Sequence, residues 1–215
     1  MHLSRIGISV AVAIAAILWG IYLWIFEGRL PCLSDLAPFS FVVTGLLLIG
    51  MWFEYKLWRV GSISKLVNRP DIRGTWEGEL VSSYIDPKTR EQVPPIECYL
   101  AVTQRFSYLQ MRQMTKESES WLIADDTRKS DKGDGYQIVG VFTNKPGVEV
   151  RDRSQIHYGA LLLDTHGLSD RPTSLTGEYW TDRETKGKLT FERRVDKVHS
   201  RFDDAAAEFS KLSDD

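Results

Sequence analysis

Two long apolar runs near the start of the chain constrain its fold more than any other feature. Residues 6–26 contain no charged side chain, and residues 36–53 form a second such run. As a helix rising about 1.5 Å per residue, the first run is roughly 31 Å long, which matches the hydrocarbon core of a bilayer. Both runs would also suit buried helices of a soluble core, and the first could be a cleaved signal peptide. No small-residue cleavage site follows it, so we predict a transmembrane helical hairpin.

The aromatic and basic residues around the two runs support this hairpin and orient it. Aromatic side chains gather near the ends of the runs, as in the interfacial belts of membrane helices: Trp19, Tyr22, Trp24, Trp52, Tyr55 and Trp58. The connector between the runs has one arginine, whereas four Lys or Arg side chains follow the second run within residues 56–69. Because Lys and Arg favour the cytoplasmic side, we expect both termini and the rest of the chain in the cytoplasm.

This topology sets the first domain boundaries. We assign residues 1–58 to the hairpin, with helices at about 6–26 and 36–53, and residues 59–71 to a basic juxtamembrane linker that suits contact with lipid headgroups. Cys32 and Cys98 then lie in different compartments and cannot form a disulfide within the chain. With 27 Lys and Arg against 29 Asp and Glu, the chain lacks the cationic excess expected of a protein that binds a nucleic-acid polymer.

From Ile72 onward the apolar pattern changes to the period of two that indicates β-strands. Turn-forming residues separate eight candidate strands: 72–85, 96–105, 108–116, 120–126, 136–144, 156–165, 174–181 and 186–194. Eight consecutive antiparallel strands fit a closed barrel or a two-sheet sandwich, and we predict the barrel over residues 72–194. The fold class is therefore a membrane-anchored all-β protein, with residues 195–215 as a flexible or helical tail.

The second and third strands allow a prediction of which side chains face the barrel interior. A tight turn at Phe106-Ser107 would put one mixed set of side chains inside: Cys98, Leu100, Val102, Gln104, Leu109, Met111 and Gln113. Tyr99, Arg105 and Arg112 would then point outward. A shift of one residue in the register would exchange the two sets.

No motif for nucleophilic, metal or phosphate-loop chemistry is present, such as G-x-S-x-G, H-E-x-x-H, C-x-x-C or G-x-x-x-x-G-K-[ST]. His157 and His166 could flank a site, with Asp164 two residues before His166. A lone carboxylate–histidine pair at a strand end is, however, more often an ordinary polar surface. We therefore predict that the protein is not an enzyme and uses no metal and no cofactor.

Residues 177–194 form the segment richest in binding chemistry. They predict a β-hairpin with the aromatic pair Tyr179-Trp180 on its first strand and a cationic turn. Aromatic rings stack on nucleobases for about 1 to 3 kcal/mol each, and guanidinium groups bind phosphate through two hydrogen bonds. The hairpin therefore suits an anionic ligand that contains a base, although an ordinary charged hairpin with core aromatics has the same composition.

The order of these features resembles a known family. Two apolar helices and a basic junction precede Asp71-Ile72-Arg73-Gly74-Thr75-Trp76, and His157-Tyr158-Gly159 and the hairpin follow. Over residues 1–194 the chain resembles the two-transmembrane, β-strand-rich CD-NTase-associated effectors of bacterial CBASS anti-phage systems. The resemblance implies a cytoplasmic barrel that senses a cyclic dinucleotide from a cognate nucleotidyltransferase (CD-NTase). It also implies self-association into oligomers and disruption of the inner membrane, which causes growth arrest or cell death (abortive infection).

The resemblance also implies site residues. The family's aromatic-x-Thr-x-Arg pattern corresponds here to Tyr179 for stacking on a base, Thr181 for a hydrogen bond and Arg183 for phosphate charge. Trp76 and Asn144 are further candidates for lining the cyclic-dinucleotide site.

One position of the hairpin departs from the family's pattern. Lys186-Gly187 stands where the family has Arg-Gly, and lysine lacks the two-pronged donor geometry of arginine. A phosphate contact through two hydrogen bonds is therefore not expected at this position.

A second resemblance concerns the start of the predicted barrel. Gly74-Thr75-Trp76 resembles the G-x-W signature of lipocalins, and in a lipocalin-like barrel Trp76 would plug one end. The alternative function is thus a membrane-tethered carrier of a small hydrophobic or amphipathic ligand. Such a carrier would more naturally face the periplasm, so the distribution of Lys and Arg favours the effector.

Overall fold

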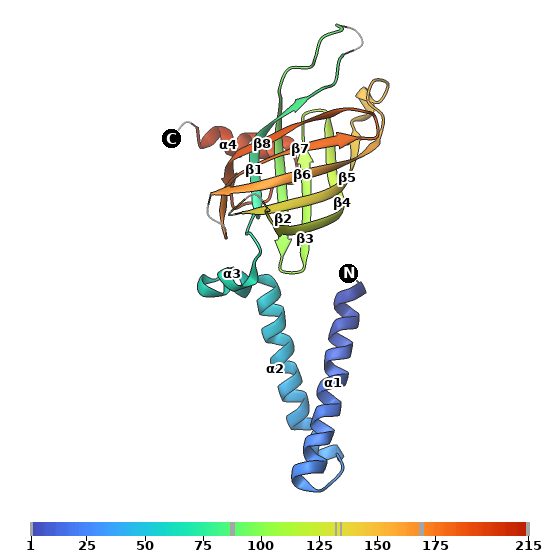
Figure 1. Cartoon of the computed structure of the whole chain (residues 1–215), viewed down its shortest axis with the longest axis vertical. Helices are drawn as coiled ribbons and strands as arrows, with labels where there is room; N and C mark the ends of the chain where they lie inside the picture. The colour runs from blue at the N-terminus through green and yellow to red at the C-terminus, as the bar shows by residue number, and fades with distance from the viewer. Residues whose placement is uncertain (1, 87–88, 132, 134, 168–169, 214–215) are drawn as a thin grey trace. The chain divides into compact units, whose positions relative to one another are not determined.

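The computed structural model describes residues 2–86, 89–131, 133, 135–167 and 170–213. The chain divides into two compact units, Met1–Leu57 and Trp58–Asp215, both drawn in Figure 1. The first unit is helical, and the second contains the β-sheet.

The first unit consists of helices α1 (His2–Glu27) and α2 (Leu36–Tyr55), which lie where the two apolar runs predict helices. The connector between them is fixed by Arg29, whose two terminal nitrogens donate to the Asp35 carboxylate at 2.6 and 2.8 Å. Near this connector the rings of Trp19 and Phe39 approach with centroids 6.5 Å apart. The sequence-based helices are therefore present, with slightly wider bounds.

Membrane-spanning character is clearest in the second helix. Within the described residues, Pro38–Tyr55 has the length and apolar composition of a membrane span, with a mean hydropathy of 1.4 and none of the stretch buried. Val12–Glu27 of α1 is a shorter apolar helix. Insertion of both helices as a transmembrane hairpin stays a prediction.

A short connecting region precedes the barrel. A 3-10 turn (η2, Leu57–Arg59) spans the boundary between the two units in the sequence. Helix α3 (Gly61–Val67) follows it and ends at Asn68, which has a left-handed conformation with φ of 49°. The Ser64 hydroxyl donates to Asp170 Oδ2 at 3.3 Å, which ties α3 to the connection between the sixth and seventh strands. The predicted basic linker thus contains a helix that belongs to the barrel unit.

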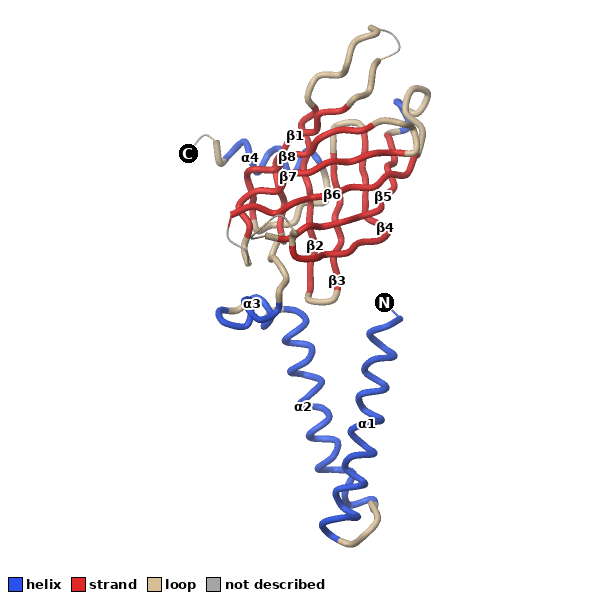
Figure 2. The backbone as a smooth tube through the Cα atoms, viewed as in Figure 1, coloured by secondary structure: helices blue, strands red, loops and turns tan. Residues whose placement is uncertain are grey.

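Eight antiparallel strands form one closed barrel in chain order (Figure 2). The first and last strands also pair, for example at Glu79 and Thr190, so the structure decides for the barrel and against the sandwich. The strands are β1 (Gly74–Ser82), β2 (Ile96–Arg105), β3 (Tyr108–Met114), β4 (Ser118–Lys129), β5 (Tyr136–Pro146), β6 (His157–Gly167), β7 (Pro172–Thr181) and β8 (Lys186–Val195). All eight predicted strands are confirmed, with ends that differ by a few residues.

The predicted interior face is also confirmed. Leu100 and Val102 of β2 and Leu109 and Met111 of β3 are buried in the main core cluster, as is Cys98. Val102 pairs with Met111 across the two strands, which is the register that a tight turn after Arg105 requires. Alternation along each strand therefore places apolar side chains inside.

Trp76 closes one end of the barrel. It is fully buried, and its indole nitrogen donates to the carbonyl of Ile72 at 2.8 Å. The Arg194 guanidinium carbon lies 4.9 Å from its ring centroid. Beside it the buried Gln104 side chain accepts from the backbone of Ile72 and donates to the carbonyl of Pro70. The chain therefore enters β1 at a sealed end.

The C-terminal tail contains helix α4 (Phe202–Lys211), which packs on the outer face of β1 and β2. Ala205 and Phe209 of α4 are buried in a second core cluster with Tyr99 and Met114. Tyr99 does face outward, as expected, but it is only 1 % exposed because α4 covers it. Its ring stacks on Phe209 with centroids 5.6 Å apart.

Candidate ligand-binding pocket

A cavity with a volume of about 490 Å³ opens at one end of the barrel. It lies where β1, β3, β5 and β7 finish, which is the end opposite to Trp76. Its apolar wall comes from Leu80, Phe142, Tyr179 and Leu189. A volume in this range suits a small organic ligand, so this cavity is the candidate binding site.

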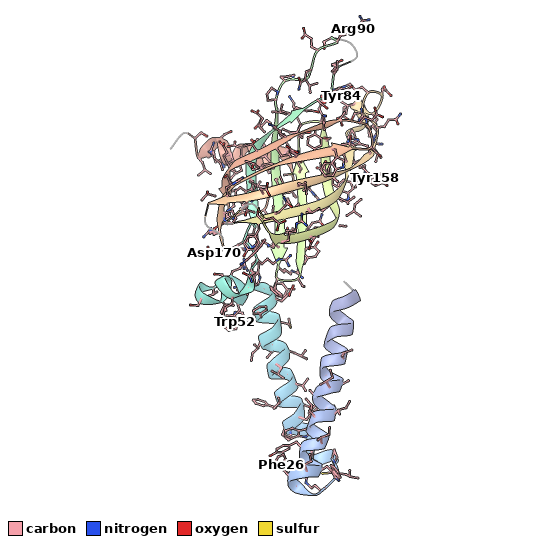
Figure 3. All side chains as sticks on the ribbon, in the orientation of Figure 1. Phe26, Trp52, Tyr84, Arg90, Tyr158 and Asp170 are labelled. Atoms are coloured by element: carbon pink, nitrogen blue, oxygen red, sulfur yellow. The ribbon has the colours of Figure 1, made fainter. Side chains whose placement is uncertain are left out.

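The connection between β1 and β2 forms one side of the mouth. It extends beyond the barrel as a hairpin (Figures 1 and 3), with Tyr84 near its base and Arg90 further out. The backbone N–H of Val93 donates to the carbonyl of Tyr84 at 3.1 Å, and Ile85 and Gln92 form an isolated bridge. Tyr84, Val93, Pro94 and Pro95 line the cavity. Aromatic and proline surface therefore borders the mouth.

Tyr179 presents its side chain to the cavity from β7. It pairs with Gly187 of β8, and a Cβ placed on Gly187 would lie 2.6 Å from the Tyr179 ring and 2.9 Å from its hydroxyl. Glycine thus makes room for the ring to lie across the neighbouring strand. Burial raises the pKa of the Tyr179 phenol, and a hydrogen bond with Ser82 acts in the opposite direction. The ring is therefore a neutral, fixed surface within the cavity.

Thr181 and Arg183 lie at the turn between β7 and β8 and also line the cavity. The hydroxyls of Thr181 and Thr185 are hydrogen-bonded at 2.7 Å. Arg183 donates to the Ser154 hydroxyl at 2.9 Å, and its guanidinium carbon lies 5.8 Å from the ring centroid of Tyr84. The cationic turn is thus held between the connection after β1 and the loop before β6.

Asn144 contributes an amide from β5. Its side-chain nitrogen donates to the hydroxyls of Ser120 at 2.8 Å and Ser118 at 3.3 Å. In this orientation both amide hydrogens are used, so the side-chain carbonyl is the group left to accept from a ligand. The structure therefore brings together four of the five predicted site residues: Asn144, Tyr179, Thr181 and Arg183.

Trp76 is the fifth predicted residue, and it lies apart from the others. It belongs to the start of β1, whereas the cavity contains residues from the end of that strand. Because its ring is enclosed between core side chains and Arg194, no surface of it faces the cavity. The structure gives Trp76 the role of a plug, which is the other role that the sequence suggests for it.

Several cavity residues escape prediction from the sequence. The loop between β5 and β6 contributes Arg153 and Ser154, and the turn between β3 and β4 contributes Lys116 and Glu117. Arg153, Ser154 and Glu117 lie outside the predicted strands, and Lys116 is the last residue of the predicted strand 108–116, so only the fold places these side chains at the mouth. The sequence feature that comes nearest to indicating them is a pair of arginines, Arg151 and Arg153, just before the predicted strand 156–165.

The histidines do not form a joint site. His157 lines the cavity, and its Nδ1 donates to the carbonyl of Gln155 at 2.9 Å. His166 lies at the other end of β6, where its Nε2 is 2.6 Å from the Thr176 hydroxyl. Within the described part of the chain, no group of three or more His, Cys, Asp or Glu side chains could hold a metal ion. The cavity lining combines hydroxyl, amide and cationic groups with the carboxylate of Glu117.

The comparisons with known proteins agree with this chemistry. No curated protein sequence matches the chain. The family model described as "Cap15, cyclic dinucleotide receptor domain" matches residues 67–193. This range is more than half of the chain and contains all of the barrel except the last residues of β8. The chain therefore belongs to the Cap15 cyclic dinucleotide receptor family of CBASS effectors.

Proposed function

We propose that the cavity is the cyclic-dinucleotide site and that ligand binding there drives self-association of the protein and disruption of the inner membrane. Family membership supports the class of ligand. The observation that carries the location is the combination of a buried aromatic ring, Tyr179, with a cationic rim at Arg183 in one cavity. A base stacks on an aromatic ring and a phosphate binds a guanidinium group, so a cyclic dinucleotide requires both surfaces in one site.

In the proposed binding mode a base enters the barrel and the phosphates stay at the mouth. Tyr179 stacks on the base, and the Asn144 carbonyl accepts from an amino group on the edge of the base. Arg183 binds a phosphate, while Thr181 gives a hydrogen bond to the ligand near the turn. The apolar side chains Leu80 and Leu189 enclose the base, which strengthens these contacts by excluding water.

For self-association, the proposed contact surface is the outer face of β4–β7. Trp180 and Val141 are 48 % and 45 % exposed and lie in one row, because both pair with Ala160. Tyr158, which pairs with Thr143 two residues after Val141, and Ile123, in the bulge of β4 beside β5, are exposed as well. An apolar patch across several strands is unusual on a protein that works alone. A second copy of the barrel is the proposed occupant of this surface, because self-association is part of the proposed function.

The proposed membrane component is the pair α1 and α2 in the bacterial inner membrane, with both termini and the barrel in the cytoplasm. Cap15 effectors are membrane-associated, and the apolar stretch of α2 supports insertion. A Cβ added at Gly45 or Gly50 would meet no other atom within 4 Å, which leaves these faces of α2 open to another helix. Assembly of many hairpins would then breach the bilayer and arrest growth.

The proposed role needs no catalysis and no cofactor, because the cyclic dinucleotide acts as the activating ligand. The tethered carrier fits the cavity less well. A carrier of hydrophobic ligands would keep an apolar mouth, whereas Arg153, Arg183 and Lys116 line this one.

Calorimetry on the full chain in lipid nanodiscs tests the proposal with a panel of cyclic dinucleotides that carry purine and pyrimidine bases. We expect at least one to bind, Arg183→Ala to weaken binding about tenfold, and added salt to weaken it further. Arg128→Ala is the matched control, since Arg128 lies on β4 and contacts Gln137 outside the cavity. A folded sample that binds no member of the panel would contradict the proposed function.

A further inference from the structure

A carboxylate lies at the mouth of a cavity that is otherwise suited to an anion. Glu117, from the turn between β3 and β4, lines the cavity and accepts a hydrogen bond from Arg153 Nη2 at 2.6 Å. Within a receptor for a dianionic ligand this carboxylate opposes binding, since like charges repel.

The partner of this carboxylate lies directly beside the arginine already assigned to phosphate. Arg183 donates to the hydroxyl of Ser154 at 2.9 Å and to the backbone carbonyl of Arg153 at 3.4 Å. A cyclic dinucleotide carries two phosphodiesters on one ring, and Arg183 can neutralise one of them. Arg153 is the neighbouring guanidinium at the mouth, and a guanidinium that binds a carboxylate has the geometry to bind a phosphate.

The ion pair between Glu117 and Arg153 can also be replaced by a contact between Arg153 and a ligand. The Glu117 backbone is fixed, because its carbonyl accepts from the N–H of Gly147 at 2.8 Å. Its side chain is 54 % exposed and that of Arg153 is 41 % exposed. The carboxylate can therefore leave by a change of rotamer while the backbone stays in place, and an ion pair this exposed is weak.

We propose that Arg153 is a second phosphate-binding residue and that Glu117 occupies it until a cyclic dinucleotide displaces the carboxylate. This inference rests on the proposed function of the cavity. Glu117 then acts as an intramolecular competitor of the ligand. Its effect is to raise the ligand concentration at which the receptor responds, without closing the cavity.

Binding measurements on the full chain in nanodiscs test the exchange, with the cyclic dinucleotide that the wild-type protein binds most tightly as the probe. Glu117→Gln should bind it about two- to fivefold more tightly, the range expected from the loss of an exposed ion pair. Arg153→Gln should bind it about tenfold more weakly, as for loss of one hydrogen bond to a charged group. Circular dichroism checks that each variant is folded.

Two control variants separate the proposed contact from a change of net charge. Glu149→Gln and Arg151→Gln alter the same charges in the adjoining segment, but neither residue lines the cavity, and both should bind as the wild type does. In the Arg153→Gln background, the gain from Glu117→Gln should fall to less than half, because the residue that Glu117 occupies is gone.

Three results would overturn the inference while leaving the proposed function intact. One is unchanged or weaker binding by Glu117→Gln, and another is an equal gain in Glu149→Gln. The third is a gain that persists in full in the Arg153→Gln background, which would indicate a general field effect. Absence of any binding by the wild-type chain would instead remove the proposed function and this inference with it.

Discussion

Replacing Tyr179 with alanine tests the central feature of the proposed site, namely that a base stacks inside the barrel. The ring is 9 % exposed, and its position across Gly187 leaves one surface for the cavity. Loss of one base–aromatic stacking contact is worth about 1 to 3 kcal/mol. This corresponds to a dissociation constant raised by roughly 5- to 150-fold.

The alanine variant also removes a buried side chain from the core cluster, so its stability must be followed as well. A buried aromatic replaced by alanine typically lowers the free energy of unfolding by about 3 to 5 kcal/mol. Tyr179→Phe separates the two effects, because it keeps the ring and loses only the hydroxyl that contacts Ser82. We expect Tyr179→Phe to bind within about twofold of the wild type, since only one net hydrogen bond changes.

Isothermal titration calorimetry of the full chain in nanodiscs gives the affinities, and thermal unfolding with and without ligand gives an independent measure. Tyr108→Ala is the control, since Tyr108 is a 46 % exposed tyrosine on β3 outside the cavity. The stacking argument fails if folded Tyr179→Ala binds as tightly as the wild type. It also fails if Tyr179→Phe loses as much affinity as the alanine variant.

Three further predictions concern the membrane and the assembly. Leu47→Arg in α2 should disfavour insertion by about 2.5 to 3.5 kcal/mol, so that dye entry into cells that co-express a cyclic-dinucleotide synthase is abolished. Dye entry that persists would show that the helices only tether the barrel. In cells with a permeabilised outer membrane, a membrane-impermeant thiol reagent should label Cys32. The same reagent should not label a cysteine introduced in place of the exposed Lys129. The reverse labelling pattern would contradict the predicted topology. Cys98 is a poor reporter, because it is buried and its thiol pKa is raised to about 12. Trp180→Glu should reduce the ligand-dependent oligomers seen by light scattering, while the affinity of the unassembled chain for the ligand stays unchanged. Oligomers that form as in the wild type would exclude this surface as the contact.

The sequence determined the strands and their faces because that information is local. Alternation along β2 and β3 and the turn at Phe106-Ser107 specify which side chains face inward, since a strand shows opposite faces at successive residues. Helices α1 and α2 are equally local, because an uninterrupted apolar run indicates a helix without reference to the rest of the chain. Tyr179, Thr181 and Arg183 belong to one hairpin, so the family's short pattern could assign all three as candidate site residues together.

The tertiary structure alone decided which other side chains meet that hairpin. Arg153 and Glu117 come from connections without a periodic pattern, and closure of the barrel brings them to the mouth. Trp76 shows the same limit, since a residue at the start of β1 and a cavity at its end lie on one strand but at opposite ends of the barrel. Tyr99 has an outward direction set by its strand, yet only the packing of α4 makes it buried. The side of a strand on which a side chain lies is determined locally, by its position in the sequence. The residues that this side chain contacts depend on how distant segments of the chain fold together.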